Sequence, residues 1–253
     1  MEAVNLSGSS RENFITPLDL VGGWPGDDAI VRSACFYDVE QYDESLFDTL
    51  GIVKPKQLLR AVTKRKAEFL AGRYCARRAL GQSGLPSYCI GIGRHRQPIW
   101  PEGMCGAISH ARQLAIAVVT RDTDIYGVGV DVEEEMTSAA VLQIQPFVLN
   151  ADEYSLLSQH LLPPEQLTTL IYSIKESFFK AAFPLVQHYF DFDAISLLEI
   201  DIHQGVCCFR INVSLHPVLP QGKRLRGQFS FPRVRGLDTC TIATLVILTR
   251  ETR

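Results

Sequence analysis

The sequence predicts an α+β fold in which each of two sheets carries a helix. Residues 126–133 alternate strictly between valine and other residues, as a strand with one buried face does. Residues 56–80 and 165–183 repeat apolar residues at helical intervals, and four short apolar segments after residue 194 have the composition of strands. Helices in such an order pack against the sheets that the strands form.

The composition is that of an ordinary globular protein. The chain has 253 residues, 46% of them hydrophobic and 21% charged, which is enough to enclose a core and excludes a disordered or coiled-coil protein. No apolar run approaches the roughly 18 uncharged residues of a membrane span. The N-terminus also lacks the basic and apolar regions of a signal peptide. We therefore expect a cytoplasmic protein without membrane contact.

Cysteine spacing and charge exclude further classes. The seven cysteines lack a C-x-x-C spacing, so we expect mostly buried, reduced thiols and neither a disulfide framework nor a zinc site. The net charge of −3 argues against a nucleic acid partner. Nine basic residues nevertheless lie between Lys54 and Arg78, opposed only by Glu68. This segment is either the wall of a phosphate site or a solvated helix face.

The first half of the chain begins with an arm, a strand and a long basic helix. Residues 1–29 are rich in Gly, Pro, Asp and Ser, which indicates a mostly irregular arm. Residues 30–37 have strand composition. Residues 56–80 predict a helix that ends at Gly81. Its expected apolar positions are Leu59, Val62, Phe69 and Ala76.

A turn-rich region at 81–103 leads to a predicted strand pair. Residues 105–109 and 114–120 are apolar runs separated by a short polar stretch, which predicts two strands joined by a tight turn. Ser109 and His110 are expected at that turn, where they can face a phosphate or fill a structural role. The sequence has neither a G-x-S-x-G elbow nor a P-loop pattern.

After the strand at 126–133, two helices and four further strands are expected in the second half. Residues 150–160 and 165–183 look helical, and the longer helix should close before Pro184. Its apolar four-residue repeat is Leu170, Ile174, Phe178 and Ala182. The strands are expected at 195–201, 206–213, 227–232 and 239–248.

Four ionisable residues of the second half form a candidate metal and phosphate site. Asp131 and Glu133 lie two residues apart on a predicted strand, so both carboxylates point to one side and can hold a hard cation. Glu176 and Lys180 share one helix face. If the helix packs beside the strand, Glu176 supplies a third ligand, as in Mg²⁺ sites that also bind a substrate phosphate. A surface ion pair and an acidic loop explain these residues equally well.

Four blocks of the sequence stand in a distinctive order. They are KRKAEFLAGRYCARRAL (64–80), RQPIWPEGMCGAISHA (96–111), GVGVDVE (127–133) and YSIKESFFKA (172–181). Together they resemble the Sfp-type 4'-phosphopantetheinyl transferases, especially the branch that includes the enterobactin synthetase component D proteins. The resemblance implies a pseudo-two-fold arrangement of two similar α/β halves, expected at residues 1–125 and 126–253, with coenzyme A in the cleft between them.

The resemblance also implies a reaction. Members of that family move 4'-phosphopantetheine from coenzyme A to a serine of an apo carrier protein or carrier domain of a fatty acid, polyketide or nonribosomal peptide synthase. They release adenosine 3',5'-bisphosphate. The same activity is expected here, with Mg²⁺ as cofactor and Mn²⁺ as a substitute. We expect a monomer, because one chain builds the cleft from its own two halves.

The family's site residues carry over to numbered positions of this sequence. Its D-x-E motif falls on Asp131 and Glu133 and its motif glutamate on Glu176, which implies three metal ligands. Lys180 matches the lysine that meets the diphosphate. The matches to the Ser-His pair and to the nucleotide and 3'-phosphate contacts are Ser109, His110, Arg65, Arg73, Arg94, Arg96 and Pro98.

The implied mechanism combines a cation with charged side chains. Mg²⁺ neutralises the diphosphate, Lys180 and His110 stabilise the leaving phosphate, and Glu176 takes the serine proton. Since a cation makes a bound carboxylate less basic, Glu176 acts either directly or through a metal-bound water. Tyr172 stands where many family members have tryptophan, and another aromatic ring can fill that packing position.

Other functions stay open at this level. Three acids and a basic helix also suit a Mg²⁺-dependent phosphodiesterase or nuclease. A non-enzymatic coenzyme A or nucleotide sensor needs only the pocket, and an inactive relative would keep the blocks for packing. The retained acids and lysine favour the transferase, because such residues do nothing for a core.

The segment after the acidic strand is a candidate partner surface. Residues 136–148 are more apolar than a free loop should be, so we expect them to contact the carrier protein, assisted by arginines of the basic segment. The alternative is that its apolar side chains pack in the core. These side chains are Val141, Ile144, Phe147 and Val148.

Overall fold

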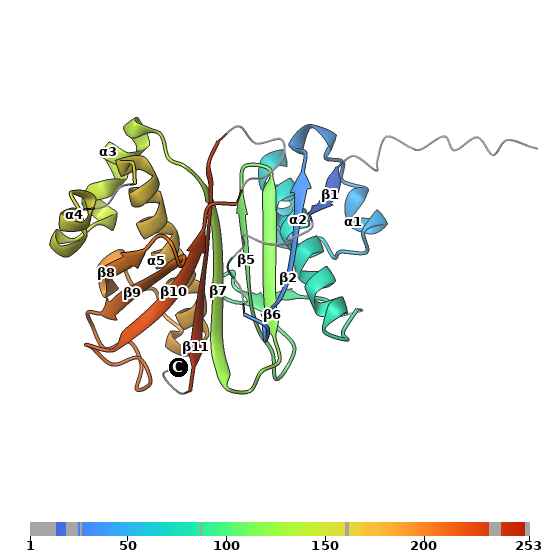
Figure 1. Ribbon diagram of the computed structural model, residues 1–253. Coiled ribbons are helices and arrows are strands. Elements are labelled where there is room, and N and C mark those ends of the chain that lie inside the picture. The colour runs from blue at the N-terminus through green and yellow to red at the C-terminus, as the bar shows by residue number, and fades with distance from the viewer. Residues whose placement is uncertain are drawn as a thin grey trace, which may run out of the picture.

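Most strands of the described residues form two antiparallel sheets that face each other, and a long helix covers the outer side of each (Figure 1). The computed structural model describes residues 14–18, 25, 27–86, 88–159, 162–232 and 239–250. The predicted α+β class, with a helix on each sheet, is confirmed.

The first sheet comes from the first half of the chain, in the strand order β1-β2-β6-β5. Its strands are β1 (Ile15–Leu18), β2 (Val31–Tyr37), β5 (Cys105–Ala111) and β6 (Leu114–Thr120). Helix α2 (Thr63–Gln82) packs across β2, β6 and β5. The smaller elements are α1 (Leu46–Thr49), two 3₁₀ turns (Val39–Gln41, Lys56–Leu58) and the hairpin of β3 (Gly91–Ile92) and β4 (Pro98–Ile99).

The second sheet has the order β7-β11-β10-β9-β8. Its strands are β7 (Ile125–Glu134), β8 (Ile195–Asp201), β9 (Val206–Ile211), β10 (Arg224–Ser230) and β11 (Thr241–Thr249). Its helices are α3 (Ser138–Val148), α4 (Ala151–Leu157), α5 (Pro164–Val186) and the 3₁₀ turn Phe192–Ala194. The expected division at residues 125 and 126 meets the start of β7, and the pseudo-two-fold relation of the two halves stays a prediction.

Three apolar cores hold these layers together. One lies between α2 and the first sheet, and another lies between α5 and the second sheet. A third core fills the space between the two sheets and contains Val128, Val130 and Val132 of β7. The opposite face of β7 is covered by α5. The alternation predicted for residues 126–133 is therefore confirmed, and it separates the inter-sheet core from the helix side.

Two glycines of β7 let α5 lie directly on the strand. A β-carbon at Gly129 would stand 1.9 Å from the carbonyl oxygen of Ser177, and one at Gly127 would stand 2.2 Å from that of Ala181. Neither distance is possible for a real side chain. The bare face of the strand therefore serves the close approach of the helix.

The start of the basic helix differs from the prediction. Helix α2 begins at Thr63, and the 3₁₀ turn at Lys56–Leu58 precedes it. Leu59 and Val62, expected on its apolar side, are 63% and 71% exposed. Pro55 starts the 3₁₀ turn, so the apolar spacing continues across two separate elements. The helix also passes Gly81 and ends at Gln82.

Three other boundaries were predicted wrongly. Ser109 and His110 lie within β5, because Ala111 pairs with Leu114 and leaves only two residues for the turn. Helix α5 continues past Pro184 to Val186, although proline has no amide to donate to the helix. The expected irregular arm contains β1, which pairs with β2, while most of the arm lies outside the described residues.

The cysteines and the helices bear on two of the excluded protein classes. All seven cysteines are free, as expected, but only Cys35, Cys75 and Cys207 are buried. Within the described part of the chain, no helix combines the length and the apolar character that crossing a membrane requires.

The close helix contact predicts a large effect of one methyl group. Gly129→Ala should lower the free energy of unfolding by about 1–3 kcal/mol or more, because the backbone of α5 must move away. Urea unfolding measures this change. Gly81→Ala is the matched control: its β-carbon would be 3.8 Å from the nearest atom, and helix propensity predicts a gain of about 0.5–1 kcal/mol. Equal stabilities of the two variants would contradict the packing described.

Candidate functional site

The carboxylate of Asp131 collects three side chains on the helix side of β7. Lys180 donates to Oδ1 at 2.6 Å, and Ser109 donates to the same oxygen at 2.7 Å. Ser173 donates to Oδ2 at 2.8 Å. Asp131 itself is only 3% exposed. A buried carboxylate therefore has hydrogen bonds to both oxygens and a cationic partner.

The partners of Asp131 come from both halves of the chain. Lys180 and Ser173 lie on α5, which the glycines of β7 bring close, whereas Ser109 lies on β5 of the first sheet. Lys180 also donates to the Ser109 hydroxyl at 3.0 Å and to the Val130 carbonyl at 3.2 Å. The structure thus brings together Ser109, Asp131 and Lys180, three residues that the sequence singled out.

The two other predicted acids share this region. The pKa of Glu133 is raised to about 8, first by burial and then by the negative charges of Asp131 and Glu176, while Lys180 opposes the shift. Burial also raises the pKa of Glu176, where Lys180 lowers it and Asp131 raises it. The three carboxylates therefore act on one another electrostatically, and Lys180 is the cation common to them.

The donor chemistry of this cluster fits a hard divalent cation. Its donor atoms are carboxylate oxygens, which Mg²⁺ prefers as ligands. Its three acids also outnumber its one lysine. Among the described residues, however, no group of three or more His, Cys, Asp or Glu side chains is arranged to hold a metal ion. Lys180 takes the counter-ion position on Asp131 in this structure. The three-ligand metal site stays a prediction.

His110 lies next to a basic and an acidic residue of α2. Its Nε2 is 3.0 Å from Nη1 of Arg65 and 3.9 Å from Oε2 of Glu68. Because a guanidinium only donates, Nε2 is the acceptor and the ring is neutral. Burial lowers the pKa of His110, Glu68 opposes this shift, and Arg65 adds to it. The residue is a neutral imidazole at the edge of the cluster.

Five predicted binding residues line one hollow, called here the α2 hollow. It has a volume of about 350 Å³ and lies between α2 and the β3–β5 region. The predicted residues in its wall are Arg65, Arg73, Arg96, Pro98 and His110. Arg94 is exposed and does not line it. The hollow has the basic wall and the size that a nucleotide requires.

Arg73 is the least exposed cation of this wall. Its residue is 7% exposed, its Nη2 donates to the Gly91 carbonyl at 3.1 Å, and its guanidinium lies 4.9 Å from the Phe69 ring centre. Burial lowers its pKa to about 10. Among the described residues its Nε has no hydrogen-bond partner. A buried guanidinium with a free donor suits an anionic ligand.

A second hollow, called here the aromatic hollow, adjoins the first. It has a volume of about 240 Å³ and shares Arg96, Pro98 and Ile108 with the α2 hollow. Lys180 lies in its wall. Its rings are His95, Trp100, Phe179, Phe183 and Tyr189. The rings of Phe179 and Tyr189 stack at 5.8 Å, and both residues also line a hollow of about 350 Å³ beside Glu176.

Several residues of these hollows were not predicted from the sequence. Phe179 and Tyr189 were not singled out, although the run from Phe178 to Phe190 is unusually rich in rings. Ser173 could have been noticed as a hydroxyl on the apolar side of a helix. Tyr172, in the expected tryptophan position, packs against Phe192 with ring centres 5.5 Å apart. Burial and the neighbouring acids, first of all Glu176, raise its pKa.

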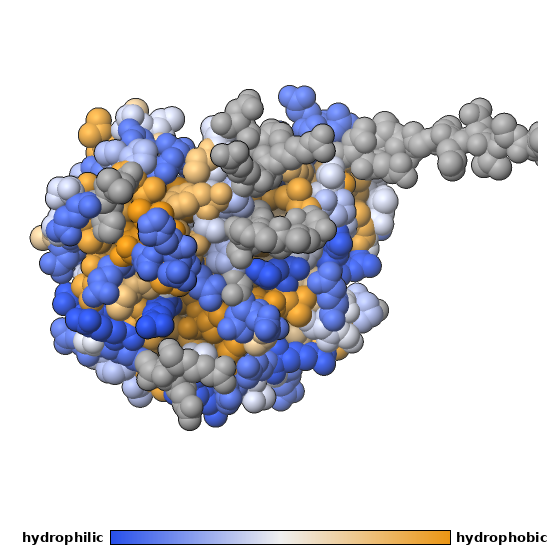
Figure 2. Space-filling view, viewed as in Figure 1, coloured by the Kyte–Doolittle hydropathy of each residue, from blue (hydrophilic) through white to orange (hydrophobic). Residues whose placement is uncertain are grey.

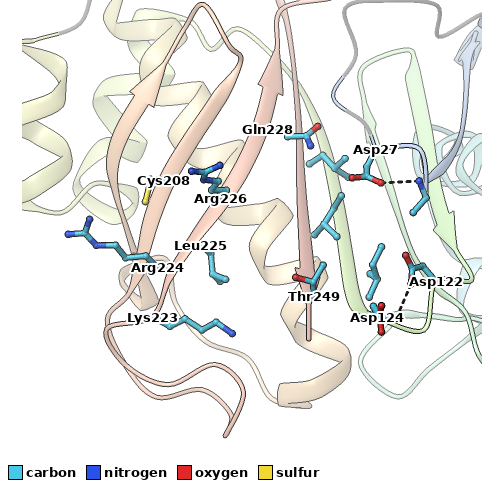
Figure 3. A pocket seen from close by; sticks show the side chains of 14 residues that line it. Asp27, Asp122, Asp124, Cys208, Lys223, Arg224, Leu225, Arg226, Gln228 and Thr249 are labelled. Atoms are coloured by element: carbon cyan, nitrogen blue, oxygen red, sulfur yellow. Dashed lines mark hydrogen bonds between the residues drawn. The ribbon is translucent and has the colours of Figure 1, made fainter. Parts of the chain in front are cut away.

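A larger hollow lies elsewhere and contains none of the predicted residues. It has a volume of about 460 Å³ along β10 and β11. Figure 2 shows apolar surface between hydrophilic residues on this face. Figure 3 shows basic and acidic residues on opposite sides of the hollow, namely Lys223, Arg224 and Arg226 against Asp27, Asp122 and Asp124. The site described above is therefore separate from the largest of these hollows.

Comparison with known proteins gives the same assignment along most of the chain. Residues 54–120 match the family model of the 4'-phosphopantetheinyl transferase N-terminal domain. Residues 127–216 match that of the 4'-phosphopantetheinyl transferase superfamily. The two matches meet at the step from β6 to β7, and the second contains Asp131, Glu133, Glu176 and Lys180.

Individual relatives extend this similarity. Enterobactin synthase component D of Salmonella typhimurium is 38% identical over 146 residues, which cover 56% of this chain and 60% of that protein. The transferase Svp of Streptomyces mobaraensis is 33% identical over 71% of this chain and 73% of its own. The transferase PptT of Mycobacterium tuberculosis is 31% identical over 68% of this chain and 78% of its own.

Proposed function

The chain belongs to the 4'-phosphopantetheinyl transferase superfamily, and we propose that it transfers 4'-phosphopantetheine from coenzyme A to a serine of an apo carrier protein. Adenosine 3',5'-bisphosphate is the second product. One observation carries the proposal: the cluster of Asp131, Ser109 and Lys180 adjoins a hollow with a basic wall. A diphosphate ester needs both parts, an anchor for its nucleotide and cations beside the bond that breaks.

We assign the nucleotide of coenzyme A to the α2 hollow. Arg73 has a buried guanidinium with a free Nε, and Arg65 and Arg96 add exposed positive charge. These groups suit a 3'-phosphate through charge-assisted hydrogen bonds. The diphosphate then comes to Lys180 and His110, which line the two adjoining hollows. The less polar pantetheine arm continues into the hollow lined by Phe179, Tyr189 and Glu176.

The side chains of the cluster have separate tasks in the transfer. Mg²⁺, or Mn²⁺ in its place, would be held by Asp131, Glu133 and Glu176 and would neutralise diphosphate charge. Lys180 holds a phosphate oxygen of the leaving group, because its ammonium is half-buried and already points at the cluster. His110, as a neutral imidazole, donates one hydrogen bond to the phosphates through its protonated nitrogen.

Glu176 is our choice for the group that takes the serine proton. Its raised pKa, caused mainly by burial, makes it a better base than an exposed carboxylate. It also lines the hollow assigned to the pantetheine arm, so an incoming serine reaches it from the open side. The proton moves either directly or through an intervening water. Burial, and after it the charge of Asp131, raises the pKa of Glu133 to about 8.

The partner is a carrier protein or carrier domain of a fatty acid, polyketide or nonribosomal peptide synthase. Relatives named enterobactin synthase component D favour a siderophore synthase as the physiological partner. We assign docking to α3, which follows β7 directly and exposes Leu142 and Phe147 by 74% and 79%. Val141 and Val148 are buried, so these two side chains pack in the core, as the alternative interpretation expected. We further propose that the enzyme is a cytoplasmic monomer.

Removal of single acids tests the reaction. Glu133→Gln and Glu176→Gln should each lower the transfer rate by about 10²–10³-fold, the usual effect of losing a group that stabilises transition-state charge. In the assay, the protein is incubated with coenzyme A, Mg²⁺ and an apo carrier, and the increase in the mass of the carrier is measured. EDTA should stop the reaction, and Mg²⁺ or Mn²⁺ should restore it. Bulk hydrolysis of coenzyme A without carrier modification would instead indicate a phosphodiesterase.

An exposed acid outside the site serves as the control for these variants. Glu199→Gln removes an exposed acid of β8 and should leave transfer unchanged. Asp131→Ala should abolish transfer and also lower stability, because Lys180 and two hydroxyls lose a buried acceptor. A folded Glu176→Gln enzyme with normal turnover would refute the assigned site.

Coenzyme A without its 3'-phosphate tests the α2 hollow. It should bind the wild type about 10- to 100-fold more weakly, the effect of losing charge-assisted hydrogen bonds. This deficit should shrink in Arg73→Gln and persist in Arg94→Gln, since Arg94 does not line the hollow. Competition binding of the two ligands measures the deficit. Equal affinities of both ligands for the wild type would show that the 3'-phosphate is held elsewhere.

Substitutions on α3 test the docking surface. Phe147→Ser should raise the Michaelis constant for the carrier about fivefold or more, as loss of an apolar anchor does, while coenzyme A binding and the melting temperature stay unchanged. Ile144→Ser should lower the melting temperature, because this side chain packs against the core. Val213→Ser, at an exposed apolar residue outside α3, is the matched control. A large loss of stability in Phe147→Ser would rule out docking at this residue.

A further inference from the structure

Four buried side chains form a continuous line between α5 and the second sheet. Asp131 and Thr244 are cross-strand neighbours on β7 and β11. Ser173 and Ser177 stand one turn apart on α5, above these two strands. The three hydroxyl residues are 0% exposed. They therefore lie inside the interface between α5 and the sheet.

The hydroxyls connect to the carboxylate one after another. Ser173 Oγ is 2.8 Å from Oδ2 of Asp131. Thr244 Oγ1 is 2.9 Å from Ser173 Oγ, and Ser177 Oγ is 2.7 Å from Thr244 Oγ1. All three distances are those of good hydrogen bonds between oxygens. We call Ser177, Thr244 and Ser173 the hydroxyl chain.

The donor and the acceptor in each of these hydrogen bonds can be assigned by starting from the carboxylate of Asp131. An ionised carboxylate only accepts, so the single proton of Ser173 points to Asp131. Ser173 Oγ can then only accept, and Thr244 donates to it or to the Ser173 carbonyl at 3.0 Å. Ser177 in turn donates to Thr244 Oγ1, with the Thr244 carbonyl at 3.2 Å as its other acceptor. When Thr244 and Ser177 donate along the chain and not to these carbonyls, the positive ends of all three hydroxyl dipoles point toward Asp131.

Another buried hydroxyl of β11 shows that this arrangement is specific. Thr241 lies on the same strand as Thr244 and is 2% exposed. Among the described residues its Oγ1 has no hydrogen-bond partner. Burial alone therefore does not provide partners for hydroxyls of this strand. Thr244 has them because it stands opposite Asp131 and under two serines of α5.

We propose that Ser173, Thr244 and Ser177 are positioning residues for the transfer reaction. They fix Oδ2 of Asp131 from the interior and so keep Oδ1 turned toward Lys180 and Ser109. None of the three touches substrate in this scheme, and each acts through the carboxylate. The inference rests on the proposed function, because it gives Asp131 a cation and a diphosphate to serve.

The physical basis is the rotation of the carboxylate. With Oδ2 held by an oriented donor, turning the group would break a buried hydrogen bond and leave an acceptor unsatisfied. Without Thr244, Ser173 loses its donor and its hydroxyl gains other directions, so the carboxylate is held less firmly. Groups at this distance from a ligand change metal affinity by about 10–100-fold when they are removed.

The test measures Mn²⁺ affinity by electron paramagnetic resonance, together with transfer kinetics. In Thr244→Val and Ser173→Ala the Mn²⁺ dissociation constant should rise about 10–100-fold. The kcat should fall, while the Michaelis constant for the carrier stays unchanged. Thr244→Ser keeps the hydroxyl and should restore both values. Thr241→Val makes the same chemical change on the same strand and should alter neither.

Stability provides a readout that needs no activity. Urea unfolding of Ser173→Ala, Thr244→Val and the double variant forms a cycle, in which a connected chain gives non-additive losses. Additive losses, or Mn²⁺ affinities equal to that of Thr241→Val, would overturn the proposal. If wild-type Mn²⁺ binding depends on the chain but no carrier is modified, the proposed function fails and the positioning of Asp131 stands. A wild type that binds no Mn²⁺ overturns both.

Discussion

The arrangement of the site depends on one buried charge, the carboxylate of Asp131. Such a group is tolerated in a protein interior only when a cation and hydrogen-bond donors surround it. Lys180 and Ser173 of α5 and Ser109 of β5 provide them. Because these elements belong to both halves of the chain, one carboxylate joins the first sheet, the second sheet and the long helix. The carboxylate of Asp131 is therefore needed both for stability and for the proposed chemistry.

The second constraint is the bare backbone of β7. Gly127 and Gly129 let α5 touch the strand, which brings Lys180 to the level of Asp131. The halves then have separate tasks. Helix α2 carries cations toward a hollow on one side of β5, while β7 and α5 carry acids on the other. Ser109 and His110 on β5 lie between them. A substrate with a nucleotide at one end and a reacting diphosphate in its middle matches this division.

Local patterns sufficed for the fold class, for the faces of β7 and for the body of α5, because alternation and helical repeats are properties of neighbouring residues. These local patterns failed to predict boundaries that depend on contacts between residues far apart in the sequence. The register between Ala111 and Leu114 extends β5 through His110, and a 3₁₀ turn interrupts the apolar spacing before Thr63. The acids and Lys180 could be chosen from motif spacing. Thr244 could not, since its contact with Ser173 spans 71 residues.

The outward position of the α3 end follows from how α5 is anchored on its other side. Lys175, the residue before Glu176, is buried and donates to the Val148 carbonyl and to Glu153, each at 2.7 Å. Glu153 also accepts the amide of Leu197 at 2.9 Å, which adds β8 to the junction. Removing the charge of Lys175 or of Glu153 would leave the other charge buried and unpaired, so this junction is costly to disrupt. Phe147 precedes Val148, and its exposure is therefore a fixed feature of the surface. A partner that packs on Phe147 therefore contacts α3 at the end that Lys175 ties to α5, the helix that carries the acid proposed to take its proton.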